Sequence, residues 1–291
     1  METRRHTVPA AEEILGEKID CLDHGHVALV EYLGGDETIE RAARLSYGKA
    51  GPRDEKARRN LLRYLMRNRH TSPFEQVVLT FDCKMPIFVA RQWVRHRTAR
   101  LNEMSGRYSE LPEEFYVPDQ ANVLAQSASN KQGREGLPLA YAGRFVETCR
   151  TNAKAEFEDY KGFINEGVAK ELARINLPLS TYTQWVWQID LHNLFHFLGL
   201  RLDTHAQYEI RVFAEALARC AKAVAPIAYE AFEDYRLNAV TLSAAEAATV
   251  KSIIADSRHG EGALDYACSD MMGMGCSERE IEGFKKAFNI Q

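Results

Sequence analysis

The sequence predicts an α+β fold, with a central antiparallel-type sheet and a dominant layer of long helices. Short segments with the apolar pattern of strands lie in the first third of the chain, and longer segments with helical spacing of apolar residues fill most of the rest. The composition agrees with a globular protein, because 45% of the 291 residues are hydrophobic and 27% are charged. We find no internal repeat and therefore expect a single domain with extensions at both ends.

Two segments are predicted to be strands. Residues 27–33 are apolar and β-prone, and Gly34 and Gly35 follow them as a turn. From Val77 to Lys84, apolar and polar side chains alternate with a period of two, which predicts a half-buried strand. The apolar face of this strand consists of Val77, Leu79, Phe81 and Cys83.

Helices are predicted around these strands. Asp36 is suited to cap a helix that runs toward Tyr47, and residues 57–69 place apolar side chains at helical spacing. Pro86 is compatible with the first turn of a helix over residues 87–97. This helix would carry on one face Gln92, Arg95 and His96.

The second half of the chain is predicted to be mostly helical. Residues 110–138 are rich in proline, glycine and polar side chains and are expected to form a long surface loop. Beyond the loop, we expect a long helix or a helical pair over residues 145–172 and a further helix over residues 183–202.

The last helix of the central domain is predicted from a capping box. Thr204 and Gln207 have the spacing of that motif, and the helix they open is expected to reach Tyr235 with an interruption at Pro226. The predicted parts of the chain are an N-terminal arm (1–19), a catalytic domain (20–238) and a C-terminal helical extension (239–291).

Composition excludes several classes of protein. No uncharged apolar run approaches the roughly 18 residues that a membrane-spanning helix needs, and no apolar stretch follows the basic N-terminus as in a signal peptide. The six cysteines are scattered without a CxxC pair, which indicates reduced thiols and a cytoplasmic location. A net charge of −4 argues against a general nucleic-acid binder.

Residues 91–107 are the most distinctive segment, with five arginines, one histidine and a single acid. Clustered guanidinium groups repel one another unless an anion lies among them, and their planar fork suits phosphate. Ser105 and Gly106 add a hydroxyl group and a flexible backbone. The alternative is a solvated basic face that pairs with surface acids. Trp93 and Val94 weaken this alternative, because they place the segment partly in the core.

A second candidate is the pair His192 and His196, which would share one helix face and hold a metal ion. Asn193 stands where zinc hydrolases with an HExxH motif carry their glutamate. Asp190 and His205 are the candidates for a third ligand. One HxxxH pair is a weak motif, so we expect no metal site here.

The common phosphate-binding and nucleophile motifs are missing. The sequence has no GxSxG, and neither GxGxxG nor GxxxxGK[ST] opens a helix. If this protein binds phosphates, it therefore binds them with arginines.

The run Arg95-His96-Arg97, seven residues and then Ser105 resembles the signature of flavin-dependent thymidylate synthases, and the chain is identified as a member of that family. Other blocks resemble the family in the expected order. They are residues 70–75, 90–93, 102–109, 173–178, 193–201 and 203–210. The resemblance covers about residues 20 to 238.

The resemblance implies a specific reaction. Members of the family methylate dUMP to dTMP, taking the carbon from 5,10-methylenetetrahydrofolate and reducing equivalents from NADPH through FAD. The resemblance also implies an α+β core and a homotetramer in which each active site is shared between subunits.

The resemblance also implies roles for individual residues. Contact with FAD is implied for Ser72, Arg95, His96, Arg97, Glu103, Asp190, His192 and His196. Contact with dUMP is implied for Gln92, Trp93, Val94, Arg95, Glu103, Met104, Ser105, Gly106, Arg107, Arg174 and Arg201. Arg201 is the catalytic residue by the same resemblance, because it would face the pyrimidine and favour its ionised N3 form.

No cysteine is expected to act as a nucleophile. Cys83 is the only one close in sequence to the arginine cluster, and the strand alternation places it on the apolar face. Ser105 lacks an evident activating base and is expected to bind substrate instead.

Two alternatives from other classes stay open at this stage. One is a metal-dependent hydrolase built on His192 and His196, which a metal assay would reveal. The other is an RNA-binding module that uses the arginine cluster, which salt-sensitive binding to RNA would reveal.

Overall fold

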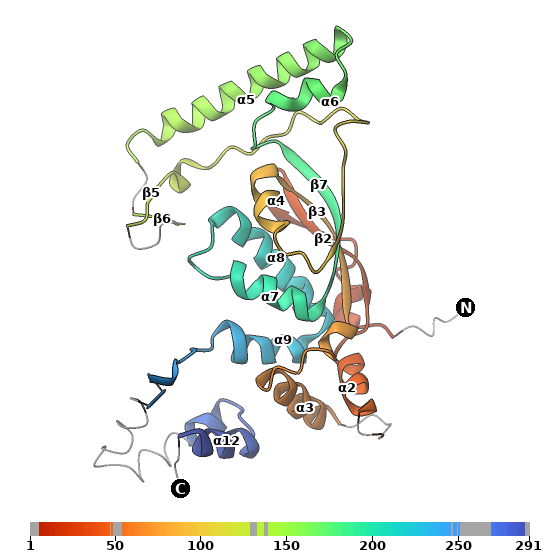
Figure 1. Cartoon of the computed structure of the whole chain (residues 1–291), viewed down its shortest axis with the longest axis vertical. Helices are drawn as coiled ribbons and strands as arrows, with labels where there is room; N and C mark the ends of the chain where they lie inside the picture. The colour runs from red at the N-terminus through yellow and green to blue at the C-terminus, as the bar shows by residue number, and fades with distance from the viewer. Residues whose placement is uncertain are drawn as a thin grey trace. The chain divides into compact units, whose positions relative to one another are not determined.

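A five-stranded sheet is the framework of the larger unit of the chain (Figure 1). The computed structural model describes residues 6–46, 48, 54–128, 133–136, 139–245, 247–248, 250 and 269–288. The strand order is β1-β2-β3-β7-β4, and all neighbouring pairs are antiparallel. The strands are β1 (Lys18–Cys21), β2 (Gly25–Leu33), β3 (Val78–Pro86), β4 (Arg100–Glu103) and β7 (Tyr182–Asp190), with β5 (Ala125–Gln126) and β6 (Arg134–Glu135) in a separate pair.

Most of the other regular elements are helices. They are α1 (Pro9–Glu12), α2 (Asp36–Leu45), α3 (Glu55–Arg67), α4 (Ile87–Trp93), α5 (Ala142–Asn165), α6 (Lys170–Ala173), α7 (Leu191–Arg201), α8 (Tyr208–Val224), α9 (Pro226–Phe232) and α12 (Glu278–Phe288). Short 3-10 turns are η1 (Phe74–Gln76), η2 (Gln120–Asn122) and η3 (Arg174–Asn176), and a π-turn is η4 (Glu233–Leu237). The predicted α+β class with an antiparallel sheet is confirmed.

The chain forms two units, Met1–Leu237 and Asn238–Gln291. In the first unit α7, α8 and α9 pack on one another, α8 also contacts β1 and β2, and α3 packs on α9. α5 lies beyond the sheet with α6 (Figure 1), where Phe157, Tyr160 and Ala173 form a small apolar cluster of their own. Among the described residues, no helix has the length and apolarity to cross a membrane.

The central strand β3 follows the predicted alternation. Val77, Leu79, Phe81 and Cys83 are fully buried, each with 0% exposure, whereas Lys84 on the other face is only half-buried. β3 pairs along its whole length with β7, from Val78 opposite Asp190 to Pro86 opposite Tyr182. The sheet is therefore held together by this pair at its centre.

The helix predicted over residues 183–202 is wrong in its first half. Residues Tyr182–Asp190 form β7, and the helix α7 begins only at Leu191. The reason lies in the alternation of this segment: Trp185, Trp187 and Ile189 point into the core, and the residues between them are half-buried or exposed. Tryptophan and β-branched residues favour strands, and pairing with β3 completes that preference.

The helix predicted over residues 87–97 ends early, at Trp93. Trp93 is fully buried, but Val94 is 38% exposed and Arg95 and Arg97 are exposed. The next positions of the buried stripe hold His96 and Arg97 instead of apolar residues, so the helix stops and the chain turns toward β4. Arg95 and His96 consequently do not share a helix face with Gln92.

The N-terminal residues belong to the fold more than predicted. Ala11 in α1 is fully buried in the main core, and the backbone N–H of Val8 donates to the hydroxyl oxygen of Tyr32 at 2.8 Å. Lys18–Cys21 pair with β2 as an edge strand. These residues were expected to form a polar arm, which their many charged side chains suggest, but their few apolar side chains pack on the sheet.

Two predicted caps have other partners. Gly35, not Asp36, is the N-cap of α2, and Asp36 accepts hydrogen bonds from the N–H groups of Ile227 and Ala228, both at 2.9 Å. The predicted capping box is not formed, because the side chain of Gln207 bonds to Gln92 and Glu209. Asp36 is therefore a tertiary cap for α9, a role that local sequence spacing cannot reveal.

The other predicted elements agree with the structure within a few residues. Residues 57–69 correspond to α3, residues 145–172 to the pair α5 and α6, and Pro226 separates α8 from α9. The predicted surface loop contains η2 and the small β5–β6 pair. Tyr47, Pro138 and Cys268 lie outside the described residues.

We expect Asp36→Ala to lower the free energy of unfolding by about 2 kcal/mol, because two buried N–H groups lose their only acceptor. Urea-induced unfolding measures the change. The matched control is Asp54→Ala, which removes an exposed cap of α3 that accepts from Ala57 at 2.7 Å and is expected to cost about 1 kcal/mol. A loss at Asp36 no larger than at Asp54 would contradict the tertiary cap.

Candidate active site

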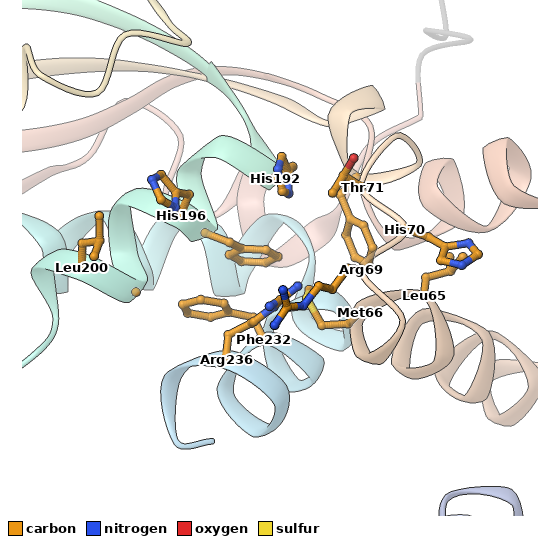
Figure 2. Close-up of a pocket in the computed structure, with 13 residues that line it drawn as sticks. Leu65, Met66, Arg69, His70, Thr71, His192, His196, Leu200, Phe232 and Arg236 are labelled. Carbon is orange, nitrogen blue, oxygen red and sulfur yellow. The ribbon is translucent and has the colours of Figure 1, made fainter. Parts of the chain in front are cut away.

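A pocket of about 400 Å³ opens between α3, α7 and η4 (Figure 2). Its lining consists of Leu65, Met66, Arg69, His70, Thr71, Phe74, His192, Phe195, His196, Gly199, Leu200, Phe232 and Arg236. Two arginines and three histidines are among these residues, and none of them is an acid. The chain as a whole has a net charge of −4, but the two arginines make this pocket cationic. A cationic pocket favours an anionic ligand.

The floor of the pocket is aromatic. The rings of Phe195 and Phe232 are stacked with centroids 4.5 Å apart and an interplanar angle of 3°. Both residues and Phe74 are buried, so each shows the pocket only a small part of its ring. An apolar floor with a polar, cationic rim suits a ligand that combines a flat ring system with phosphates or carboxylates.

His96 connects this pocket to the arginine-rich segment. Its Nε2 accepts a hydrogen bond from Nε of Arg201 at 3.2 Å, and its ring lies 6.0 Å from that of His196, centroid to centroid. Burial, followed by the positive charge of Arg201 and then by His196, lowers the pKa of His96 to about 4. His96 is therefore neutral at pH 7, as its role as an acceptor from Arg201 requires.

Arg201 keeps its charge without a carboxylate partner in the part of the chain that the structure describes. Burial lowers the pKa of its guanidinium group, but arginine stays protonated at any physiological pH. Its neutral partner His96 orients the group without compensating the charge. The positive charge of Arg201 is consequently available to a ligand.

The five arginines of residues 91–107 form no ion pair with any acid in the described ranges. Arg100 donates to the side-chain oxygen of Gln188 at 3.1 Å, and Arg107 donates to the hydroxyl oxygen of Tyr108 at 3.0 Å. Arg95 and Arg97 are exposed. The alternative of a basic face that pairs with surface acids is therefore not supported, and the cluster is left with its charge uncompensated.

The predicted dUMP-binding residues 103–107 lie on and beside β4. Glu103 accepts from the hydroxyl group of Thr183 at 2.6 Å, which fixes the carboxylate at the sheet edge. Gly106 is buried, and a Cβ atom on it would lie 3.0 Å from Cδ of Arg174. Gly106 and Arg174, 68 positions apart, are thus brought into contact, as two residues expected to hold one substrate should be.

Some of the predicted residues are buried or already have a hydrogen-bond partner within the protein. The side chain of Trp93 lies in the core, so only its backbone can contact a substrate. Asp190 is the N-cap of α7, where it accepts from the backbone N–H of Asn193 at 2.9 Å. Gln92 bonds to Gln207, and the backbone of Met104 donates to the carbonyl oxygen of Gln184 at 2.9 Å.

The remaining predicted residues are available for contact. Val94 and Ser72 are exposed, and Ser105 is half-buried with its hydroxyl oxygen 3.3 Å from the backbone N of Arg107. His192 and His196 both line the pocket. The individual roles of all these residues stay predictions.

A metal centre at His192 and His196 is not supported. Within the part of the chain that the structure describes, no group of three or more histidine, cysteine or acidic side chains is arranged to hold a metal ion. Asp190 caps α7, and the ring of His205 bonds to Asp203 at 2.8 Å. Neither of the two predicted third ligands therefore completes the site.

Sequence reasoning assigned no role to Arg69 and Arg236, although both line the pocket. Arg69 follows the end of α3, and Arg236 lies in the π-turn η4 at the end of the first unit. They are 167 positions apart in the sequence, and no local pattern joins them. Only the packing of α3 on α9 brings them to the same pocket.

The chain matches the family described as Thymidylate synthase complementing protein over residues 28–227. It is 46% identical to the flavin-dependent thymidylate synthase of Rickettsia conorii, over 98% of this chain and 98% of that protein. It is 51% identical to the flavin-dependent thymidylate synthase of Gluconobacter oxydans, over 83% of this chain and 81% of that protein.

Solved structures agree with these matches. A UMP/dUMP methylase, PolB, from Streptomyces cacaoi, solved with bound 5-Br dUMP, superposes with a TM-score of 0.69 at 33% identity. The alignment covers 75% of this chain and 99% of that structure. By sequence, fold and the signature from Arg95 to Ser105, the chain belongs to the flavin-dependent thymidylate synthase family.

Proposed function

We propose that this enzyme methylates dUMP to dTMP, with methylenetetrahydrofolate as the carbon donor and NADPH, through FAD, as the reductant. The observation that carries the proposal is the uncompensated charge of the signature arginines beside the His96–Arg201 contact. All four ligands are anionic, so one region has to attract several negative charges. The methylase of Streptomyces cacaoi, bound with a brominated dUMP, supports the choice of a uridine nucleotide.

The residues of the pocket fit a flavin. Phe195 and Phe232 supply the aromatic floor, and His192 and His196 supply polar groups at its rim. Besides these two histidines, the residues we propose to hold FAD are Ser72, Arg95, His96, Arg97, Glu103 and Asp190. When it is bound, the flavin supplies hydride transfer, and the protein supplies binding, orientation and electrostatics.

The substrate side is proposed to lie along the signature. Arg107 and Arg174 carry the charges suited to the phosphate of dUMP, and the buried Gly106 leaves room for backbone to approach it. Gln92, Glu103, Ser105 and the backbones of Trp93, Val94 and Met104 complete the proposed dUMP contacts. The hydrogen bond from Thr183 holds the Glu103 carboxylate in place without removing its charge.

Arg201 is proposed to stabilise the pyrimidine in its ionised N3 form. A carboxylate partner would compensate the guanidinium charge, whereas the neutral ring of His96 only orients it. The full positive charge then faces the ligand in a partly buried place, where electrostatic interactions are stronger than in water. This arrangement favours the pyrimidine anion over its neutral form.

We further propose a homotetramer with shared active sites and a cytoplasmic location. Large apolar side chains on and after α5 and α6 are exposed, among them Phe145 at 47%, Leu172 at 58% and Ile175 at 72%. Exposed large apolar side chains are compatible with an interface between subunits. The signature arginines do not line the pocket of their own chain, which is compatible with sites completed by a neighbouring copy.

We expect the purified chain to bind FAD and to oxidise NADPH faster when dUMP is present. The reason is that the flavin and nucleotide sites are proposed to adjoin at His96 and Arg201. The visible spectrum of the protein reports bound flavin, and chromatography of the products reports dTMP. A colourless protein that takes up no added FAD would refute the proposal.

We expect Arg201→Lys to weaken dUMP binding by about one to two orders of magnitude, because a compact ammonium group cannot replace a charge-assisted guanidinium contact. Calorimetric titration measures the affinity, and a thermal melt controls for folding. Unchanged affinity with lower stability would instead indicate that Arg201 only caps the end of α7.

We also expect Arg201→Gln to raise the pKa of His96 from about 4, because the substitution removes a nearby positive charge. NMR titration of the His96 ring measures this pKa.

We expect Cys83→Ala to leave dTMP formation within a few-fold of the original rate, at a cost of about 1 kcal/mol in stability. Cys83 is fully buried, and burial raises the pKa of its thiol well above the usual range. A thiol in such a place is neither accessible nor a thiolate. Loss of turnover in a folded variant that still binds FAD and dUMP would show that Cys83 takes part in the chemistry.

A further inference from the structure

The wall of the pocket opposite α7 carries two arginines, Arg69 and Arg236, that the proposed function leaves without a role. Figure 2 shows both guanidinium groups directed into the same part of the pocket, across from His192 and His196. The two charges influence each other, since burial and then the charge of Arg69 lower the pKa of Arg236. The pocket thus holds two like charges close together.

Neither guanidinium group has a carboxylate partner among the described residues, although other arginines nearby do. On α3, Arg58 pairs with Glu40 at 2.7 Å, and Arg63 pairs with Asp234 at 2.5 Å. The acids of this region are therefore committed to arginines that hold the fold together. Two neighbouring cations without an acid are electrostatically unfavourable until an anion binds between them.

The backbone of Arg69 points to a role for its side chain. Its φ angle is 57°, in the left-handed region, and the next residue, His70, donates from its backbone N to the carbonyl oxygen of Leu65 at 2.9 Å. This is the position after a helix end where glycine is most favourable. A side chain that destabilises its own backbone position is expected where it serves binding.

We propose that Arg69 and Arg236 bind a doubly charged oxyanion, a phosphate monoester or a pair of carboxylates, at the outer end of a co-substrate of this enzyme. The inference rests on the proposed function. Two planar guanidinium forks match two negative charges in number and geometry. Apart from Ser72, the proposed flavin contacts come from α7 with its cap Asp190 and from the signature, and none of them is Arg69 or Arg236, so these two arginines are left for a second anionic ligand over the same aromatic floor.

Two co-substrates of the proposed reaction carry such a group. NADPH differs from NADH by one phosphate monoester on its adenosine ribose. Folates end in one or more glutamyl residues, each with carboxylates. Matched pairs of probes separate these two sources: NADP+ against NAD+, and monoglutamyl tetrahydrofolate against tetrahydropteroate. NAD+ lacks the phosphate monoester, and tetrahydropteroate lacks the two glutamyl carboxylates.

The experiment is calorimetric titration of the FAD-loaded full chain with each probe, for the original protein, Arg69→Gly and Arg236→Gln. The control is Arg67→Gln, which removes the same charge from the end of α3 but does not line the pocket. We expect the original protein to prefer one probe of a pair, and both pocket variants to bind that probe about 10- to 100-fold more weakly. The control and the FAD affinity should not change.

Arg69→Gly also controls for misfolding. Glycine suits the left-handed backbone at this position, so the melting temperature should stay equal or rise while binding weakens. Retained discrimination between the probes in both variants would overturn the inference. Variants that lose only FAD affinity would also overturn the inference, because this result would show that Arg69 and Arg236 bind the flavin.

The two proposals fail in different ways. An original protein that takes up no FAD and forms no dTMP refutes the proposed function, and the same titrations on that protein still report whether the arginine pair discriminates the probes. A protein that turns over normally but binds both probes of each pair equally well refutes only the proposed role of Arg69 and Arg236.

Discussion

The packing of Trp93 is the interaction on which the site depends. Its ring lies 5.5 Å from that of Trp185, 5.1 Å from that of Trp187 and 5.1 Å from that of Phe197, centroid to centroid. Trp93 ends α4 two positions before Arg95, where the signature begins. The two other tryptophans lie on β7, and Phe197 lies on α7 between His196 and Arg201. One buried aromatic cluster therefore fixes the start of the signature, the central strand pair and the helix of the pocket relative to one another.

The rigid aromatic cluster around Trp93 allows polar side chains beside it, such as that of Arg201, to keep their position without an ion pair. Side chains that are held in place by a packed core do not need ion pairs for their position, and their charge remains available. Arg201 follows this rule, since it is oriented by the neutral ring of His96 rather than by an acid. The ion pairs of Arg58 and Arg63 serve the opposite purpose, because they join α3 to other helices.

The sequence predicted the parts of the fold that have a strong local signal. The alternation of Val77 to Lys84 was sufficient for β3, and the signature was sufficient for the family. β7 was missed although Trp185, Trp187 and Ile189 alternate as in a strand, because no glycine or proline separates this segment from the helix α7 that follows it. The contacts His96–Arg201 and Gly106–Arg174 join distant segments, so spacing could not reveal them.

Sequence patterns do not reveal burial or contacts between distant segments, so resemblance and structure complement each other at this site. Resemblance named residues such as Trp93 by position, whereas burial shows that only the backbone at this position can reach a ligand. Resemblance was silent on Arg69 and Arg236, which the pocket includes. Because the unpaired charges of the site repel one another in the empty protein and are compensated by bound anions, ligand binding and folding stability are coupled. An enzyme built in this way is least stable when it is empty, and each anion that it binds restores part of the stability that the unpaired arginines remove.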